Sequence, residues 1–168
     1  MIALFGLPLF TLIHVVLSIV GIVAGLVVVG GLMAGKQFGG WNLTFLVTTV
    51  LTNVTGFLFP FARLLPSHIL GGISLVILPL AIAALYWKHL AGPWRRIFVI
   101  ATVTALYFNV FVLMVQLFGK FPLLLVVAPT QQSPAFGVTQ LLVLVLFVML
   151  GRAAVRGFAA GAGSVARA

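Results

Sequence analysis

Three histidines account for most of the chemistry that this sequence could perform. The chain contains no Cys, Asp or Glu, so it has no thiolate or side-chain carboxylate to serve as nucleophile, general base or metal ligand. Hydrolase chemistry is disfavoured, because a serine–histidine pair would lack the acidic group that orients the histidine. Imidazole remains as a metal ligand and as a base near neutral pH. A reactive site would therefore have to start from His14, His68 or His89.

His14 lies in an apolar stretch, TLIHVVLSIVGIVAG, which covers residues 11–25. At 100° per residue, one helical stripe of this stretch contains the histidine and four small or weakly polar residues. These five positions are Thr11, His14, Ser18, Gly21 and Gly25. Small residues allow a second helix to approach closely, and a histidine on such a stripe faces protein rather than lipid. We therefore expect His14 to point into a helical bundle.

The overall composition is that of an integral membrane protein. The chain has 168 residues, of which 64% are hydrophobic and 5% are charged, whereas soluble domains contain about 25% charged residues. No polar segment is long enough to form a soluble domain. The sequence therefore predicts an all-α transmembrane helical bundle over residues 1–158, followed by a basic cytoplasmic tail at 159–168.

Five stretches approach the roughly 20 apolar residues that a transmembrane helix needs. They cover about 4–32, 41–61, 67–87, 94–118 and 137–151. Pro79 should kink the third helix, because proline lacks a backbone donor and clashes with the preceding turn. The connection before the fifth helix is too apolar for an ordinary loop, and three prolines interrupt it. We expect this connection to lie along the outer interface or to cap the bundle, and the chain beyond Gly151 to fray.

The basic residues predict an orientation. With the N-terminus outside, seven of the nine Lys and Arg residues fall on inner segments, as the positive-inside rule requires. The inner set is Lys36, Lys88, Arg95, Arg96, Arg152, Arg156 and Arg167, and the outer set is Arg63 and Lys120. We interpret this basic excess as a topology signal rather than as a nucleic-acid-binding surface.

In this orientation the strongest polar side chains converge in the outer leaflet. At 1.5 Å per residue, a deep tier lies roughly 12–15 Å below the outer surface and a shallow tier lies within about one turn of it. The deep tier is His14, Asn53 and Asn109, and the shallow tier is His68, Gln116 and Gln140. One interpretation is an outward-opening pocket for a hydrophobic cofactor or small ligand. The alternative is that these residues only form hydrogen bonds that pack the helices together.

Two cofactors are candidates for such a pocket. A b-type haem would use His14 and His68 as iron ligands, although their depths differ by roughly 9–12 Å. A quinone could accept hydrogen bonds from His14, Asn53 and Asn109 without matched depths. Passage of a small solute or anion is less favoured, because few polar residues continue through the inner half. A packing subunit of a larger membrane complex, or a homo-oligomer, is the remaining alternative, and the sequence favours a non-catalytic role.

Three segments carry a resemblance to a known group of proteins. They are TLIHVVLSIVGIVAGL, TTVLTNVTGFLFPF and APTQQSPAF, which cover residues 11–26, 48–61 and 128–136. They resemble segments of small polytopic proteins of the bacterial inner membrane, a group without an assigned activity. The resemblance implies a location in the bacterial inner membrane and no reaction. Di-haem cytochromes b561 are excluded, because they need four histidine ligands and this chain has three histidines.

Overall fold

The described part of the chain is all-helical. The computed structural model describes residues 2–59 and 66–165, and these ranges contain no strand. The helices are α1 (Ile2–Met33), α2 (Gly39–Phe57), α3 (Pro66–Ile82), the π-helix η1 (Ala83–Trp87), α4 (Trp94–Lys120), α5 (Pro122–Val127) and α6 (Pro134–Val165). Most of the outer hairpin that the sequence places between α2 and α3 lies outside the described residues.

Glycine and proline set most of the helix boundaries. α1 ends in a Schellman motif, in which Gly35 takes a φ of +70° and the backbone N–H groups of Gly35 and Lys36 donate to the carbonyls of Leu32 and Gly31. Glycine is favoured at that position because it has no Cβ to clash in the left-handed region. Prolines precede or begin α4, α5 and α6, where the missing N–H costs no helical hydrogen bond.

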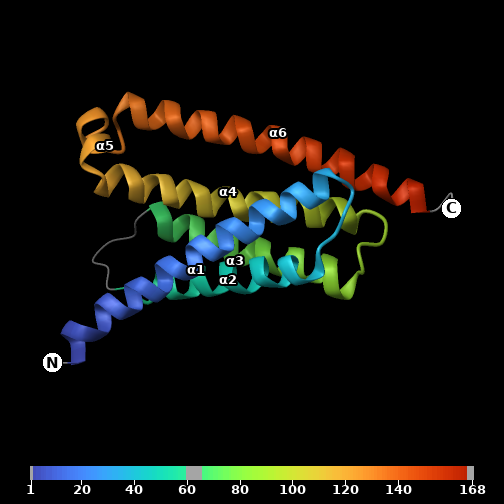
Figure 1. Ribbon diagram of the computed structural model, residues 1–168, viewed down its shortest axis with the longest axis horizontal. Coiled ribbons are helices and arrows are strands. Elements are labelled where there is room, and N and C mark those ends of the chain that lie inside the picture. The colour runs from blue at the N-terminus through green and yellow to red at the C-terminus, as the bar shows by residue number, and fades with distance from the viewer. Residues whose placement is uncertain (1, 60–65, 166–168) are drawn as a thin grey trace.

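The five long helices form one antiparallel bundle. Figure 1 shows α1, α2, α3, α4 and α6 running along the long axis with successive helices in opposite directions, and α5 lying at one end between α4 and α6. α4 packs extensively against three long helices, α1, α3 and α6. α6 packs extensively against two long helices, α1 and α4. α4 is therefore the central helix, and α6 lies at the edge of the bundle.

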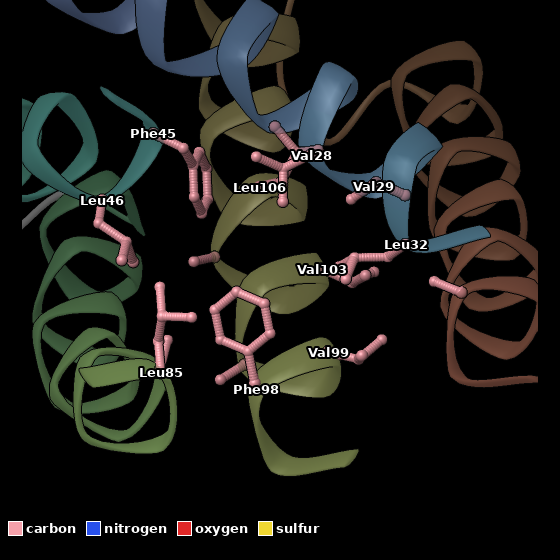
Figure 2. Close-up of a cluster of buried hydrophobic side chains, with 14 of the residues drawn as sticks. Val28, Val29, Leu32, Phe45, Leu46, Leu85, Phe98, Val99, Val103 and Leu106 are labelled. Carbon is pink, nitrogen blue, oxygen red and sulfur yellow. The ribbon is translucent and has the colours of Figure 1, made fainter. Parts of the chain in front are cut away.

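The apolar core is centred on α4. Figure 2 shows side chains of α1, α2 and η1 converging on α4 from two sides. The labelled set is Val28, Val29 and Leu32 from α1, Phe45 and Leu46 from α2, Leu85 from η1, and Phe98, Val99, Val103 and Leu106 from α4. Phe45 and Phe98 are each 1% exposed, so the core is closed at its centre.

Among residues 2–59 and 66–165, four helices are long and apolar enough to cross a membrane. They are Leu9–Met33, Ser67–Trp87, Trp94–Lys120 and Pro134–Gly161, and their outward faces carry many exposed Leu, Val and Ile side chains. A helical bundle with such faces is typical of a membrane protein. α2 is not in this set, because threonines and asparagines occupy much of its 19-residue length and lower its hydropathy.

One feature differs from the sequence-based expectations. The chain does not fray after Gly151, because α6 continues to Val165. Alanine, the best helix former, is frequent in this segment, and the segment packs against the C-terminal end of α1. Pro79, where the sequence predicts a kink, lies inside α3, and the π-helix η1 begins four residues later at Ala83. Prolines and π-helical turns both interrupt the regular helical hydrogen-bond ladder, and both are known sites of helix kinks.

Candidate functional site

His14 faces α2, as the small-residue stripe of α1 predicts. Its Nδ1 lies 2.8 Å from Thr55 Oγ1, and the Thr55 hydroxyl lies 2.7 Å from the carbonyl oxygen of Leu51, to which it donates. Threonine has a single O–H to donate, so with that O–H on the Leu51 carbonyl the pair is made by the tautomer in which Nδ1–H of His14 donates to Thr55 Oγ1. The neutral ring then carries its lone pair on Nε2, which is the atom that would bind a metal or accept a hydrogen bond.

Aromatic rings surround both histidines at this end of the bundle. The Phe59 ring packs edge-on against His14 with centroids 5.1 Å apart, and Phe10 lies 4.9 Å from Phe59. His68 instead packs against Phe57, at 5.7 Å. The two histidines thus have different aromatic partners, and the described residues contain no group of three or more metal-binding side chains.

The two asparagines of the deep tier meet at Thr49, which is fully buried. Asn109 Nδ2 donates to Thr49 Oγ1 at 3.3 Å. Asn53 Nδ2 donates to the backbone carbonyl of Thr49 at 2.8 Å and to Ser74 Oγ at 3.3 Å. Gly21 of α1 packs against the Thr49 side chain, because a Cβ on Gly21 would lie 3.4 Å from Thr49 Oγ1. This network, which we call the Thr49 network (Thr49, Asn53, Ser74 and Asn109), links α2, α3 and α4.

Gln116 and Gln140 of the predicted shallow tier do not join the deep tier. Gln140 of α6 donates to the carbonyl of Phe111 at 3.3 Å, while its Oε1 is buried without a partner among the described residues. Gln116 is exposed on α4. The convergence expected from helix depth therefore holds for Asn53 and Asn109, while His14 pairs separately with Thr55. Sequence reasoning missed Thr49 and Ser74 as partners, because depth along a helix does not specify its rotation.

A groove runs between α4 and α6, on a side of the bundle that the sequence did not single out. Its volume is about 520 Å³. Successive turns of α4 contribute Arg96, Ile100, Thr104 and Phe108, and successive turns of α6 contribute Leu144, Val148, Arg152 and Arg156. Tyr107 and Phe147 also line the groove, with ring centroids 5.6 Å apart. The groove is apolar and aromatic along most of its length and has three arginines at one end.

These three arginines have no partner within the described chain. Arg95, one residue before Arg96, donates to the carbonyl of Phe158 at 3.1 Å and lies over the Phe158 ring. Arg96, Arg152 and Arg156 are exposed and form no hydrogen bond or ion pair with a described residue. The sequence contains no Asp or Glu to pair with them. The i, i+4 spacing of Arg152 and Arg156 in the sequence indicates that they share one face of α6. The sequence does not indicate that Arg96 lies beside them, because that position follows from the antiparallel packing of α4 against α6.

The fold and its outward apolar faces define a polytopic helical membrane bundle. Comparison with known protein families, characterised proteins and solved structures finds no match. The function must therefore be argued from the residues of this chain.

Proposed function

We propose that this protein is a non-catalytic membrane protein that binds a hydrophobic or amphipathic molecule in the α4–α6 groove. The observation that carries the proposal is the groove itself, with a volume of about 520 Å³ and a lining of aromatic and aliphatic side chains. Ligand sites are typically concave, mostly apolar and of this size, with a few convergent polar groups. The three arginines at one end are those polar groups.

The α4–α6 groove lies away from the polar residues that the sequence predicts as an outer-leaflet binding site. The Thr49 network already satisfies the amide donors of Asn53 and Asn109 within the protein, and such bonds stabilise helix packing. Binding of a haem or quinone at His14 is a separate hypothesis. Nδ1 of His14 is paired with Thr55, so Nε2 is the atom that would bind the iron of a haem or form a hydrogen bond with a quinone. An absorption spectrum of the purified protein tests it, because a Soret band lost in His14→Ala would indicate haem.

The topology that accompanies this function has five crossings, with the N-terminus outside and the three groove arginines inside. α2 crosses although it is less apolar, because it lies alongside α1 and α3 and its Asn53, Thr55 and Thr48 side chains are satisfied by hydrogen bonds within the bundle. The basic residues favour this orientation. The resemblance to bacterial inner-membrane proteins favours the bacterial plasma membrane.

The proposed function is tested by filling the groove. Val148 lines the groove and is 45% exposed, whereas Val145, on the same helix, is outside the groove and 48% exposed. Val148→Trp should displace the bound molecule, and Val145→Trp should leave it in place. The measurement is mass spectrometry of the organic extract of each purified protein, normalised to protein. Equal amounts of the same molecule in both variants, or none in the unmodified protein, would contradict the proposal.

A further inference from the structure

We infer that the molecule in the α4–α6 groove is an anionic phospholipid, whose phosphate binds between Arg96, Arg152 and Arg156. The inference rests on the proposed function and names the chemical class of its ligand. It is carried by three observations: the unpartnered charges at one end of the groove, their arrangement, and the length of the apolar part.

The charges favour an anion from outside the chain. Guanidinium groups bind phosphate strongly, because their planar donors match its oxygens in pairs. Two other cations at this end have internal partners, since Arg95 binds Phe158 and Lys88 lies over the Trp94 ring, and Lys36 is exposed outside the groove. The three groove arginines have no such partner among the described residues. With no side-chain carboxylate in the sequence, the ammonium group of a zwitterionic headgroup would have no acidic side chain to pair with beside the arginines.

The arrangement of the arginines is unfavourable without a ligand. Arg152 and Arg156 are one turn apart on the same face of α6, where like charges repel. Arg96 lies in the first turn of α4, where the helix dipole disfavours a cation. A phosphate among the three groups would remove both penalties. Basic pockets between membrane helices on the cytoplasmic side are typical sites for anionic lipid headgroups.

The length of the groove fits one lipid leaflet. Arg96 and Phe108 are twelve residues apart on α4, as are Arg156 and Leu144 on α6, and twelve helical residues span about 18 Å. One leaflet contributes about 15 Å of hydrocarbon. A phosphate at the arginines therefore places an acyl chain along Ile100, Val148 and Phe108. A free phosphate ion would use the charged end alone and leave the apolar length empty.

The test compares two lipids with identical acyl chains, phosphatidylglycerol and phosphatidylcholine. Each is titrated into delipidated full-length protein in detergent, and bound lipid is counted by native mass spectrometry. We expect the unmodified protein to bind phosphatidylglycerol at least tenfold more tightly. Each of Arg96→Gln, Arg152→Gln and Arg156→Gln should reduce that preference by about fivefold. Lys36→Gln removes an exposed charge outside the groove and should leave the preference unchanged.

The outcomes separate this inference from the proposed function. Equal binding of both lipids by the unmodified protein, or an unchanged preference in all three glutamine variants, overturns the lipid class while leaving a groove ligand in place. Displacement of phosphatidylglycerol by inorganic phosphate at equal concentration also overturns it, because it indicates a free-anion site. Unaltered binding of both lipids by Val148→Trp overturns the proposed function as well. The comparison of lipids on the unmodified protein stands even if a variant fails to fold.

Discussion

At the scale of single residues, the buried polar side chains fall into two groups with opposite energetic effects. Thr49 and Thr55 each take part in hydrogen bonds between helices. Thr52 Oγ1 and Thr102 Oγ1 are buried with no partner among the described residues. A satisfied polar group stabilises the fold modestly, whereas an unsatisfied one costs its full desolvation. Substitutions that look alike in the sequence should therefore change stability in opposite directions.

The pairing of Asn109 with the Thr49 hydroxyl predicts a measurable coupling. In a double-mutant cycle of Thr49→Val and Asn109→Ala, the coupling energy should be about 0.6 kcal/mol, and no more than about 1.7 kcal/mol, as for comparable bonds in membrane proteins. The free energy of unfolding is measured in mixed micelles. The control cycle pairs Thr49→Val with Asn53→Ala. Because Asn53 binds the Thr49 backbone carbonyl, that coupling should be near zero, and equal couplings would contradict the network.

Thr102 provides the opposite prediction. Its side chain is 0% exposed, and valine has the same shape without the hydroxyl. Thr102→Val should therefore raise the free energy of unfolding by roughly 1 kcal/mol, because a buried unsatisfied group is removed. Thr55→Val should lower it by about the same amount, because it removes the partner of His14. The measurement is thermal unfolding of the two variants in the same detergent. Lower stability of both variants would contradict the prediction and show that the Thr102 hydroxyl has a partner.

At the scale of elements, α6 and the end of α1 approach each other backbone to backbone. A Cβ on Gly157 would overlap the carbonyl oxygen of Met33, and a Cβ on Gly161 would lie 2.6 Å from that of Gly35. The two glycines are four residues apart, which is the spacing of the small-residue motif that lets membrane helices pack closely. This contact positions the part of α6 that carries Arg152 and Arg156.

Enlarging Gly157 should separate α6 from α1. Gly157→Ala is expected to destabilise the bundle by about 1–3 kcal/mol, because backbone cannot move aside as a flexible side chain can. Gly151→Ala is the matched control on the same helix, since its Cβ would make an ordinary 3.5 Å contact with Val103. That variant should be neutral or slightly stabilising, as alanine favours the helix. Similar losses for both variants, measured by unfolding in mixed micelles, would argue against the close contact.

The extent to which the sequence predicts this fold depends on the kind of signal. Long apolar runs predict the helices of the bundle well, because lipid requires every backbone group to be paired within a helix. The end of α6 was predicted wrongly, because low hydropathy after Gly151 says little about helix formation in an alanine-rich segment. Its close contact with α1 depends on two glycines whose partners are backbone atoms distant in sequence.

The site was less predictable than the helices. Depth along each helix brought Asn53 and Asn109 together correctly, but it gave no information on rotation, so Thr49 was not expected as their shared partner. The groove arginines were interpreted only as topology signals. Their common position follows from the antiparallel pairing of α4 and α6, and no local pattern in the sequence specifies which helices pair.

At the scale of the whole molecule, the charge of each end of the bundle depends on its basic residues alone, because the sequence has no acidic side chains. The ends of α1, η1 and the beginning of α4 lie at the same end of the bundle as the groove arginines, whereas the end of α4 lies at the other (Figure 1). The bundle therefore has one strongly basic end. The proposed orientation puts that end at the inner surface, where an anionic cytoplasmic leaflet would attract it.

The five-crossing topology can be tested by cysteine labelling, because the chain has no native cysteine. Single cysteines replace Lys36, Leu58, Lys88 and Lys120, which lie near the ends of α1, α2, η1 and α4. A membrane-impermeant maleimide applied to intact cells should label positions 58 and 120 and leave 36 and 88 unlabelled until the membrane is opened. Labelling of position 58 on the same side as position 36 would show that α2 does not cross.

The contact of α6 with α1 also determines the order in which the protein can be assembled during synthesis. Gly157 emerges from the ribosome roughly 120 residues after Met33, which is about 6–24 s at the usual rate of 5–20 residues per second. During that interval the glycine stripe of α1 is covered by α2, but its C-terminal end has not yet met α6. The C-terminal end of α1 therefore waits for α6 after α2, α3 and α4 have been made, and the groove cannot form until α6 has been added.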